Sequence, residues 1–164
     1  MNETAIDPAQ FRQVLGNYPT GVTVITALNA SGDPVGMVVG TFTSVSLDPP
    51  LVGFLPSKNS SSWPMIEAAG HFCVNVLARD QLDLCKAIAK PGPDKFAGVD
   101  YAISQHELPV LAQTMVSIEC RLHAVHDAGD HWFVTGLVLG LESKRAADPM
   151  LFHSGQYGGF SANA

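Results

Sequence analysis

Apolar and β-branched residues along this chain gather in short runs that predict β-strands. Runs of this kind cover residues 22–28, 35–42, 51–55 and 72–77, and residues that favour turns separate them. The first two runs flank the turn sequence Asn-Ala-Ser-Gly-Asp-Pro at 29–34, so together they predict a hairpin.

A longer segment, residues 116–126, alternates between apolar and polar positions, as a strand with one buried face does. The apolar positions are Val116, Ile118, Cys120, Leu122 and Ala124, and the polar ones are Ser117, Glu119, Arg121 and His123. After a turn at 128–130, residues 131–141 are apolar on both faces. The two segments therefore predict a long antiparallel hairpin.

Helical signals are fewer. Asp7 and Pro8 are residue types favoured at a helix N-cap and first position, and Phe11, Val14 and Leu15 form an apolar stripe after them. Helices are also predicted near 65–69 and across 79–90, where Pro-Gly-Pro at 91–93 ends the second one. Residues 94–111 are predicted to be a loop.

Six or so strands with a few helices predict a mainly β fold, a closed or nearly closed antiparallel barrel. Residues 1–164 are predicted to form a single domain, because the length is typical of one domain and no repeat divides the chain. A doubly wound sheet would need regular alternation of strands and helices. The glycine-rich motifs of nucleotide-binding α/β domains are also absent.

The charge balance and the composition of the chain exclude several classes of protein. The chain has 9 Lys and Arg against 15 Asp and Glu, a net charge of −6, so it lacks the basic surface that nucleic-acid binding needs. No apolar run reaches the roughly 20 residues of a membrane-spanning helix, and the N-terminus lacks a signal-peptide pattern. Cys73, Cys85 and Cys120 are widely spaced, which favours buried thiols in a reducing compartment. We expect a cytoplasmic oligomer that binds neither nucleic acid nor membrane.

Between residues 34 and 78 the only charged side chains are Asp48, Lys58 and Glu67, while serines and threonines are frequent. Such a surface suits a large, flat, partly apolar ligand with an anionic tail. A β core whose serines and threonines occupy turns explains the same composition. Within this stretch, loop 57–64 adds hydroxyls, the Lys58 cation and the free N–H groups of a helix start, which together predict an anion site of phosphate size.

His123, His126 and His131 lie near Cys120 in the sequence, but their spacing does not predict a metal site. Because side chains alternate along a strand, His123 and His126 point to opposite faces, and no paired His or Cys motif completes a site. The Gly-x-Ser-x-Gly motif of serine hydrolases is absent too. His131 in the hairpin turn and His153 are each either ligand contacts or structural residues.

Several longer motifs follow one another along the chain. They are Tyr-Pro-Thr-Gly-Val-Thr-Val-Ile-Thr at 18–26, Thr-Phe-Thr-Ser-Val-Ser-Leu-Asp-Pro-Pro-Leu at 41–51, Ser-Ser-Trp at 61–63, Phe-Cys-Val-Asn-Val-Leu at 72–77, Pro-Asp-Lys-Phe-Ala-Gly at 93–98, Gly-Asp-His at 129–131 and Leu-Phe-His-Ser-Gly at 151–155. In this order, from about Asp7 to Tyr157, the chain resembles the short-chain flavin reductases of two-component flavin-dependent monooxygenases. The resemblance implies a six-stranded antiparallel split β-barrel with Greek-key topology, an FMN-binding fold with a few flanking helices that works as a homodimer.

The resemblance also implies an enzyme that uses NADH, or less often NADPH, to reduce FMN or FAD, which then diffuses to a partner monooxygenase. By the same resemblance, Met37, Val38, Gly40, Thr41 and Thr43 line the flavin ring and ribityl chain, and Ser57, Lys58, Ser61 and Ser62 hold the phosphate. The residues expected near the nicotinamide of NADH are His131, Phe152, His153, Ser154 and Gly155. Relatives can carry an arginine near the cofactor phosphates where this chain has Ala87 beside Lys86, which leaves the choice between FMN and FAD open.

In such an enzyme hydride passes from nicotinamide to flavin, and the cofactors supply the reactivity. The protein has to stack the two rings about 3 to 3.5 Å apart and to stabilise negative charge on the flavin, for which the Thr41 hydroxyl is a candidate. We expect no nucleophile, general base or metal from the protein, and we assign His131 and His153 to the positioning of NADH. Three alternatives stay open: a carrier of the same fold that keeps its flavin, a pyridoxamine phosphate oxidase-like enzyme, and a ligand-binding module.

Overall fold

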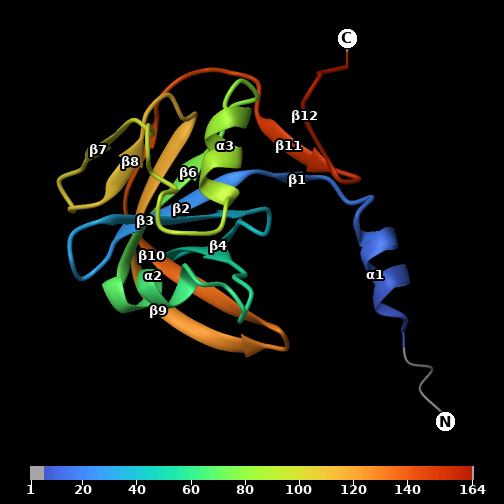
Figure 1. Cartoon of the computed structure of the whole chain (residues 1–164), viewed down its shortest axis with the longest axis horizontal. Helices are drawn as coiled ribbons and strands as arrows, with labels where there is room; N and C mark the ends of the chain where they lie inside the picture. Colours follow the sequence, from blue (N-terminus) through green and yellow to red (C-terminus); the bar gives the residue numbers. More distant parts are fainter. Residues whose placement is uncertain (1–5, 164) are drawn as a thin grey trace.

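Seven strands form one antiparallel sheet in the computed structural model, which describes residues 6–163 (Figure 1). From edge to edge they are β3 (Pro34–Val39), β2 (Thr23–Leu28), β6 (His71–Val76), β9 (Val116–Ala128), β10 (His131–Ser143), β5 (Pro50–Phe54) and β4 (Thr43–Leu47). All neighbouring pairs are antiparallel. The two predicted hairpins, β2–β3 and β9–β10, are confirmed.

The sheet curls on itself because its two edge strands are close in the sequence. β3 and β4 lie at opposite edges, yet only residues 40–42 connect them, a stretch that spans at most about 14 Å from Val39 to Thr43. Thr41 ties this connection to the residue after β5, since its Oγ1 accepts a hydrogen bond from Leu55 N at 2.9 Å. The predicted, nearly closed barrel is confirmed. Its sheet has seven strands rather than six because β4, a mostly exposed strand without a strong apolar pattern, joins the edge.

Two smaller sheets accompany the barrel. β1 (Thr20–Gly21), β11 (Met150–His153) and β12 (Gln156–Gly159) form one of them, in the order β1-β11-β12. β7 (Tyr101–Ile103) pairs with β8 (Pro109–Leu111) in the other, so the predicted loop over 94–111 is wrong at these two strands. Three-residue strands are too short to show a period in the sequence, and whether they form depends on pairing with a neighbouring strand.

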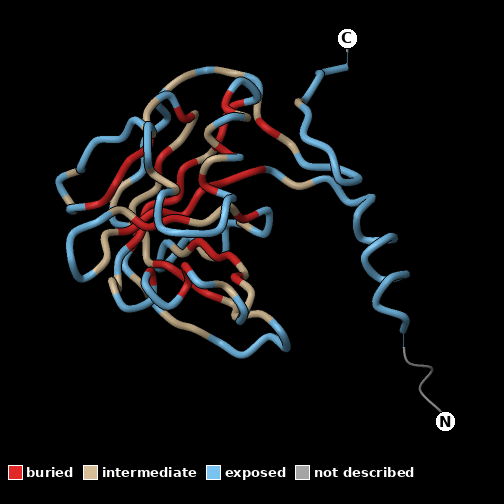
Figure 2. Tube along the Cα trace, in the orientation of Figure 1, coloured by how far each residue is buried: buried red, intermediate tan, exposed pale blue. Residues whose placement is uncertain are grey.

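Buried residues concentrate inside the curled sheet and under the crossover helix α3 (Leu82–Ala89), as Figure 2 shows. In the barrel, Phe54 meets Phe72 edge to face with ring centroids 5.3 Å apart, and α2 (Trp63–Ala69) adds Trp63. A Cβ atom at Gly136 would lie 2.5 Å from Cζ of Phe72. Glycine in the middle of β10 therefore leaves room for the phenylalanine ring.

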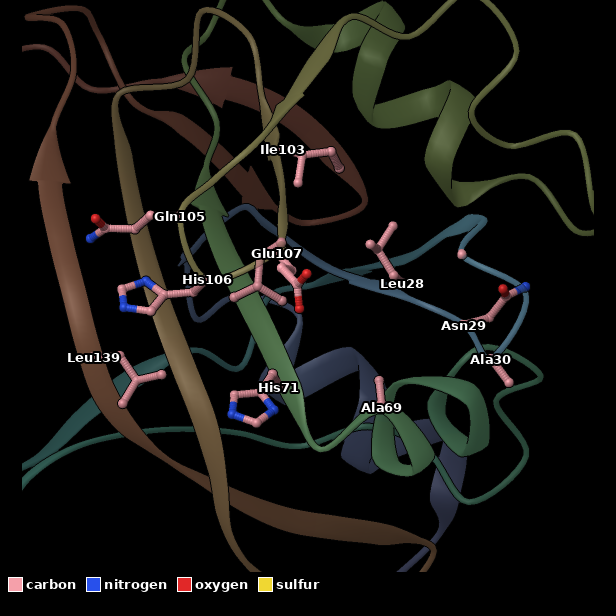
Figure 3. A pocket seen from close by; sticks show the side chains of 12 residues that line it. Leu28, Asn29, Ala30, Ala69, His71, Ile103, Gln105, His106, Glu107 and Leu139 are labelled. Carbon is pink, nitrogen blue, oxygen red and sulfur yellow. The ribbon is translucent and has the colours of Figure 1, made fainter.

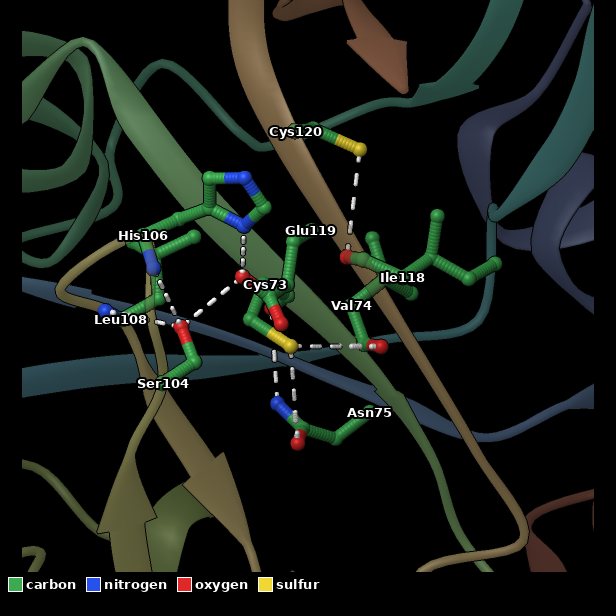
Figure 4. A network of polar contacts seen from close by, with 9 residues as sticks. All are labelled: Cys73, Val74, Asn75, Ser104, His106, Leu108, Ile118, Glu119 and Cys120. Carbon is green, nitrogen blue, oxygen red and sulfur yellow. Dashed lines mark hydrogen bonds and ion pairs between the residues drawn. The ribbon is translucent and has the colours of Figure 1, made fainter. Parts of the chain in front are cut away.

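The buried side-chain amide of Asn75 connects three strands. The Asn75 amide nitrogen donates to Val24 O at 3.1 Å and to Thr26 Oγ1 at 3.0 Å, and its oxygen accepts from Leu111 N at 2.9 Å. Asn75 thus joins β2, β6 and β8 and leaves no polar atom of its amide unpaired. Figure 4 shows it beside the buried thiol of Cys73.

The three cysteines are free and buried, as the sequence analysis predicts. Burial raises the pKa of Cys73 and of Cys120 to about 12, and it also raises the pKa of Cys85. These thiols therefore stay protonated and unreactive near neutral pH. None of the helices within residues 6–163 is long and apolar enough to cross a membrane.

The N-terminal helix α1 (Pro8–Leu15) stands away from the barrel (Figure 1). It begins as predicted, because the Asp7 carboxylate accepts hydrogen bonds from Ala9 N at 3.3 Å and Gln10 N at 3.2 Å. No residue of this helix is buried, and Phe11, Val14 and Leu15 are all more than half exposed. An amphipathic helix normally buries its apolar stripe, so this face lacks a partner within the described chain.

Candidate functional site

Part of the predicted flavin site comes together in a hollow of about 350 Å³, here called the central hollow. It lies between β3, the loop before α2 and the end of α3. Its lining residues are Met37, Val38, Asn59, Ser60, Ser61, Ser62, Ile88, Ala89, Lys90, Pro91 and Lys95. Met37, Val38, Ser61 and Ser62 are the predicted flavin residues among them.

Two further hollows extend from Val38 toward the C-terminal strands. A small one, of about 120 Å³, brings Val38 and Gly40 together with Phe152 and Tyr157. The next, of about 360 Å³, shares Tyr157 and adds His153. The predicted nicotinamide residue Phe152 therefore lines the same small hollow as the predicted flavin residues Val38 and Gly40, whereas His153 lines the next hollow.

The central hollow contains a cation that the sequence analysis missed. Lys95 Nζ donates to Ser62 Oγ at 3.0 Å and to Gly36 O at 3.4 Å. Burial lowers the pKa of Lys95, and no carboxylate within residues 6–163 forms an ion pair with it. An ammonium group without a counter-ion at the wall of a hollow favours an anionic ligand. In the sequence, this lysine lies within the motif Pro-Asp-Lys-Phe-Ala-Gly at 93–98, which could have pointed to it.

The start of α2 differs from the prediction. Ser60 Oγ accepts hydrogen bonds from Ser62 N at 3.3 Å and from Trp63 N at 3.2 Å. These two N–H groups are therefore already satisfied, so they are not among the free helix-start donors that were expected to bind the anion. The hydroxyls of Ser61 and Ser62 with Lys90 and Lys95 remain as groups able to bind a phosphate.

Three other predicted residues lie together at the tip of the β9–β10 hairpin. Ser57 pairs with His131 in an isolated β-bridge, and Lys58 forms an ion pair with Asp127 while its Nζ lies 4.4 Å from the Trp132 ring centroid. This lysine holds the pKa of Asp127 below its ordinary value. Lys58 is therefore already paired, and it does not line the central hollow beside Ser61 and Ser62.

His131 and the remaining predicted residues are accessible. His131 Nδ1 lies 2.7 Å from Asp130 Oδ1 in the hairpin turn. Thr41 and Thr43 are exposed on the connection between the sheet edges and at the start of β4. Ser154 and Gly155 form the turn between β11 and β12, with φ of 48° and 77°, as hairpin turns with two positive φ angles do. Within one chain, the predicted site residues therefore lie in three places: the hollows, the tip of the β9–β10 hairpin, and the exposed segment that leads into β4.

A hollow of about 720 Å³ lies elsewhere, between the β2–β3 turn, β10 and the segment 103–108 (Figure 3). None of the predicted site residues lines it. His106 Nδ1 lies 2.5 Å from Glu119 Oε2, which also accepts a hydrogen bond from Ser104 Oγ at 2.8 Å (Figure 4). Ser104 Oγ in turn accepts hydrogen bonds from the backbone N–H groups of His106 and Leu108. This network therefore stabilises the turn between β7 and β8.

The chemistry of the central hollow suits a flavin phosphate. Met37, Val38 and Ile88 supply apolar surface for a flat ring, while two serine hydroxyls and two lysines supply donors and positive charge. The residues lining it include no His, Cys, Asp or Glu. This donor set can bind and orient an anionic ligand, but it offers no nucleophile and base pair.

Comparison with known proteins agrees with this chemistry. The model of the flavin reductase like domain matches residues 15–161. A flavin reductase of Pseudomonas putida is 51% identical over 159 residues, which cover 97% of this chain and 94% of the relative. The reductase subunit HsaB of a flavin-dependent monooxygenase from Rhodococcus jostii is 48% identical over 155 residues, 94% of this chain and 79% of that protein.

A solved structure gives the same result for the fold. The NADH:FAD oxidoreductase SgcE6 of Streptomyces globisporus, in complex with NAD and FAD fragments, superposes with a TM-score of 0.89 at 33% identity. The match covers 98% of this chain and 99% of that one. Both sequence and structure therefore show that the chain belongs to the family of flavin reductase-like domains.

Proposed function

We propose that the protein is an NADH-dependent flavin reductase that binds FMN or FAD as a substrate and releases the reduced flavin to a separate monooxygenase. Family membership supports this, as do the names of relatives that are reductase subunits or NADH:FAD oxidoreductases. The observation that supports it most directly is that Phe152, expected near the nicotinamide, lines the same small hollow as Val38 and Gly40, which are expected at the flavin.

The residues of the central hollow bind and orient. Met37 and Val38 provide the apolar surface for the flavin ring, and Ser61, Ser62 and Lys95 provide hydroxyls and positive charge for its phosphate. When bound, the flavin supplies the hydride acceptor. We assign the positioning of NADH to Phe152, which lines the same small hollow as Val38, and to His153, which lines the next one. The side chains thus set the geometry of the two substrates, and none is needed as a nucleophile or general base.

We propose that the active form is a homodimer. The apolar stripe of α1 has no partner in the described chain, and Leu47 on β4 is 97% exposed. Ser57, Lys58 and His131 also lie at the hairpin tip rather than in the hollows. A second copy of the chain can cover the apolar surfaces and bring a hairpin tip to a neighbouring hollow. We also propose a cytoplasmic location, because three buried free thiols suit a reducing compartment.

The test is NADH oxidation by flavin-free protein at increasing concentrations of added FMN or FAD. A diffusible-flavin reductase shows saturable dependence on added flavin, well beyond one flavin per chain. Turnover that is complete with one bound flavin indicates a carrier that keeps its flavin. Absence of NADH oxidation at every flavin concentration contradicts both.

A further inference from the structure

The loop before α2 connects the wall of the central hollow to the tip of the β9–β10 hairpin, and we propose that it couples the binding of flavin to the binding of NADH. This loop, residues 56–62, is here called the linking loop. Lys58 is its positioning residue, because the lysine side chain joins the loop to the hairpin. The proposal rests on the proposed function, since it takes the central hollow as the phosphate site and His131 as a contact of NADH.

Backbone contacts hold the linking loop against the hairpin tip. Ser57 of the loop faces His131 of the hairpin in an isolated antiparallel β-bridge. Two backbone hydrogen bonds accompany this bridge: Lys58 N donates to Asp130 O at 3.0 Å, and Trp132 N donates to Pro56 O at 2.9 Å. The loop and the hairpin tip thus form a short two-stranded segment, so a shift of one is expected to move the other.

The Lys58 side chain adds a second connection to the same tip. Its ammonium group forms an ion pair with Asp127 and lies 4.4 Å from the centroid of the Trp132 ring. The lysine holds the pKa of Asp127 below its ordinary value, so this carboxylate is charged near neutral pH. Gly129 N donates to the other carboxylate oxygen at 3.2 Å, which fixes Asp127 within the hairpin turn. The ion pair therefore joins the loop to an ordered part of the hairpin.

The other end of the linking loop reaches the central hollow through its own hydrogen bonds. Ser57 O accepts from Ser60 N at 3.0 Å, and Ser60 Oγ accepts from Ser62 N at 3.3 Å. Ser62 Oγ in turn accepts from Lys95 Nζ at 3.0 Å. Consecutive contacts therefore lead from the hairpin tip to the lysine of the central hollow. Energetic coupling between two sites can be carried by a contiguous network of this kind.

A phosphate bound at Ser61 and Ser62 restricts the linking loop and, through it, the hairpin tip. His131 lies in this tip, with Nδ1 2.7 Å from Asp130 Oδ1, and Asp130 O accepts the backbone bond from Lys58. NADH then binds to a tip that flavin has already ordered, so less conformational freedom is lost on binding. Because coupling between binding sites is reciprocal, NADH strengthens flavin binding by the same factor.

The first measurement is the ratio of the Kd for a tetrahydro analogue of NADH, which cannot donate hydride, without FMN to its Kd with saturating FMN. Direct contact between the two ligands contributes to this coupling factor in every variant, so differences between variants isolate the contribution of the loop. Lys58→Met removes the positive charge and retains the aliphatic stem, and Asp127→Asn removes the negative charge. Combining Lys58→Glu with Asp127→Lys restores an ion pair with its charges exchanged.

The matched control is an ion pair outside the loop and the hairpin. Arg145 and Asp80 form such a pair, and their side chains are 29% and 66% exposed, against 30% and 70% for Lys58 and Asp127. Asp80→Asn therefore removes a similar interaction at a similar depth, without changing the link between the two sites.

The proposal predicts that each single variant at Lys58 or Asp127 lowers the coupling factor at least about threefold, while the Kd for FMN alone stays within about twofold. The charge-exchanged double variant returns the factor to within about 1.5-fold of the wild-type value, and Asp80→Asn leaves it unchanged. Unchanged coupling in the single variants, or no recovery in the double variant, overturns the proposal. So does a rise of about tenfold in the Kd for FMN alone in Lys58→Met, since that assigns Lys58 directly to the phosphate.

Hydrogen exchange followed by mass spectrometry tests the same link without NADH. FMN slows amide exchange at residues 128–132 of the hairpin tip in the wild-type protein, and it does so less in Lys58→Met. Equal protection of the tip in both proteins, or none in either, overturns the proposal. Neither measurement involves turnover, so each decides the coupling separately from the NADH oxidation assay that tests the function. A protein that binds no FMN at all overturns the function and the coupling together.

Discussion

Lys95 Nζ donates a 3.0 Å hydrogen bond to Ser62 Oγ, and this contact joins two segments that are 33 positions apart in the sequence. It places a lysine without a carboxylate partner beside two serine hydroxyls that were predicted to hold the flavin phosphate. Lys58, closer to these serines in the sequence, forms an ion pair with Asp127 instead. We therefore propose that Lys95 supplies positive charge at the phosphate site.

Replacing this charge weakens flavin binding. Lys95→Met retains most of the aliphatic stem and removes the ammonium group, so the Kd for FMN is expected to rise at least about tenfold, as for loss of a charged hydrogen bond. Lys144→Met, at an exposed position after β10, is the control and leaves the Kd unchanged. Flavin fluorescence titration measures both. If Lys58→Glu weakens FMN binding strongly and Lys95→Met does not, the phosphate lies at the hairpin tip.

The kinetics of a His131 variant can distinguish a role in positioning NADH from a role in proton transfer. His131→Ala is expected to raise the KM for NADH about fivefold, the loss of roughly one hydrogen bond, while kcat stays within about twofold. The pH profile of kcat is expected to keep its shape, because the imidazole moves no proton in the reaction. His126→Ala, an exposed histidine on β9, is the matched control. An unchanged KM for NADH would exclude the positioning role.

The α1 helix is expected to be part of the dimer interface. A charge in its apolar stripe, Phe11→Asp or Leu15→Asp, has little effect on a lone chain in which these residues are exposed, but it destabilises a dimer that buries them. Light scattering after size-exclusion chromatography is predicted to show a shift from dimer to monomer. Gln13→Asp leaves the apolar stripe intact and is the control. A dimer that persists in both charged variants places the interface elsewhere.

The buried amide of Asn75 is expected to contribute more to stability than an exposed one. Asn75→Ala leaves the buried Leu111 N–H and Val24 carbonyl without their side-chain partner, so the free energy of unfolding is expected to fall by about 2–3 kcal/mol. Asn17→Ala removes amide hydrogen bonds to Gln13 O and Val14 O on the exposed α1 and is expected to cost under about 1 kcal/mol. Urea denaturation measures both. Equal losses would show that burial of the Asn75 network adds nothing.

Because of the buried thiols, the free energy of unfolding is expected to decrease at alkaline pH. Burial raises the pKa of Cys73 and Cys120 from 9.0 to about 12, so between these values the unfolded chain loses protons that the folded chain keeps. The stabilisation is complete below about pH 9 and decreases above it, with a limiting slope of about 1.4 kcal/mol per pH unit for each thiol. The double variant Cys73→Ala, Cys120→Ala is expected to show a shallower decrease between pH 9 and 11 in urea denaturation. Parallel curves for the two proteins would contradict this account.

Strand positions with a strong local pattern were predictable from the sequence. The hairpins β2–β3 and β9–β10 have β-branched or alternating residues on both arms and turn residues between them, and both are confirmed. β4 and the pair β7–β8 were not predicted. β4 is mostly exposed, and β7 and β8 have three residues each, so these strands depend on pairing with a neighbour rather than on their own composition.

The residues of the central hollow also include some that were predicted from the sequence and some that were not. Met37 and Val38 adjoin Ser61 and Ser62 as the family resemblance implied, because β3 runs beside the loop before α2. Lys95 escaped prediction because its place depends on how segment 92–97 folds back against Gly36, a contact between residues 59 positions apart. Lys58 was placed with the serines because of its closeness in sequence, but the strand register at the hairpin tip brings it to Asp127.

The central claim is that reduced flavin leaves the protein and carries electrons to a separate acceptor. Two compartments divided by a dialysis membrane test it under anaerobic conditions, with protein, NADH and FMN on one side and cytochrome c on the other. The account predicts that cytochrome c across the membrane is reduced at a rate that depends on both protein and added flavin, well above that of a mixture without protein. Rapid oxidation of NADH beside the protein, with cytochrome c across the membrane no more reduced than in the protein-free mixture, would contradict it.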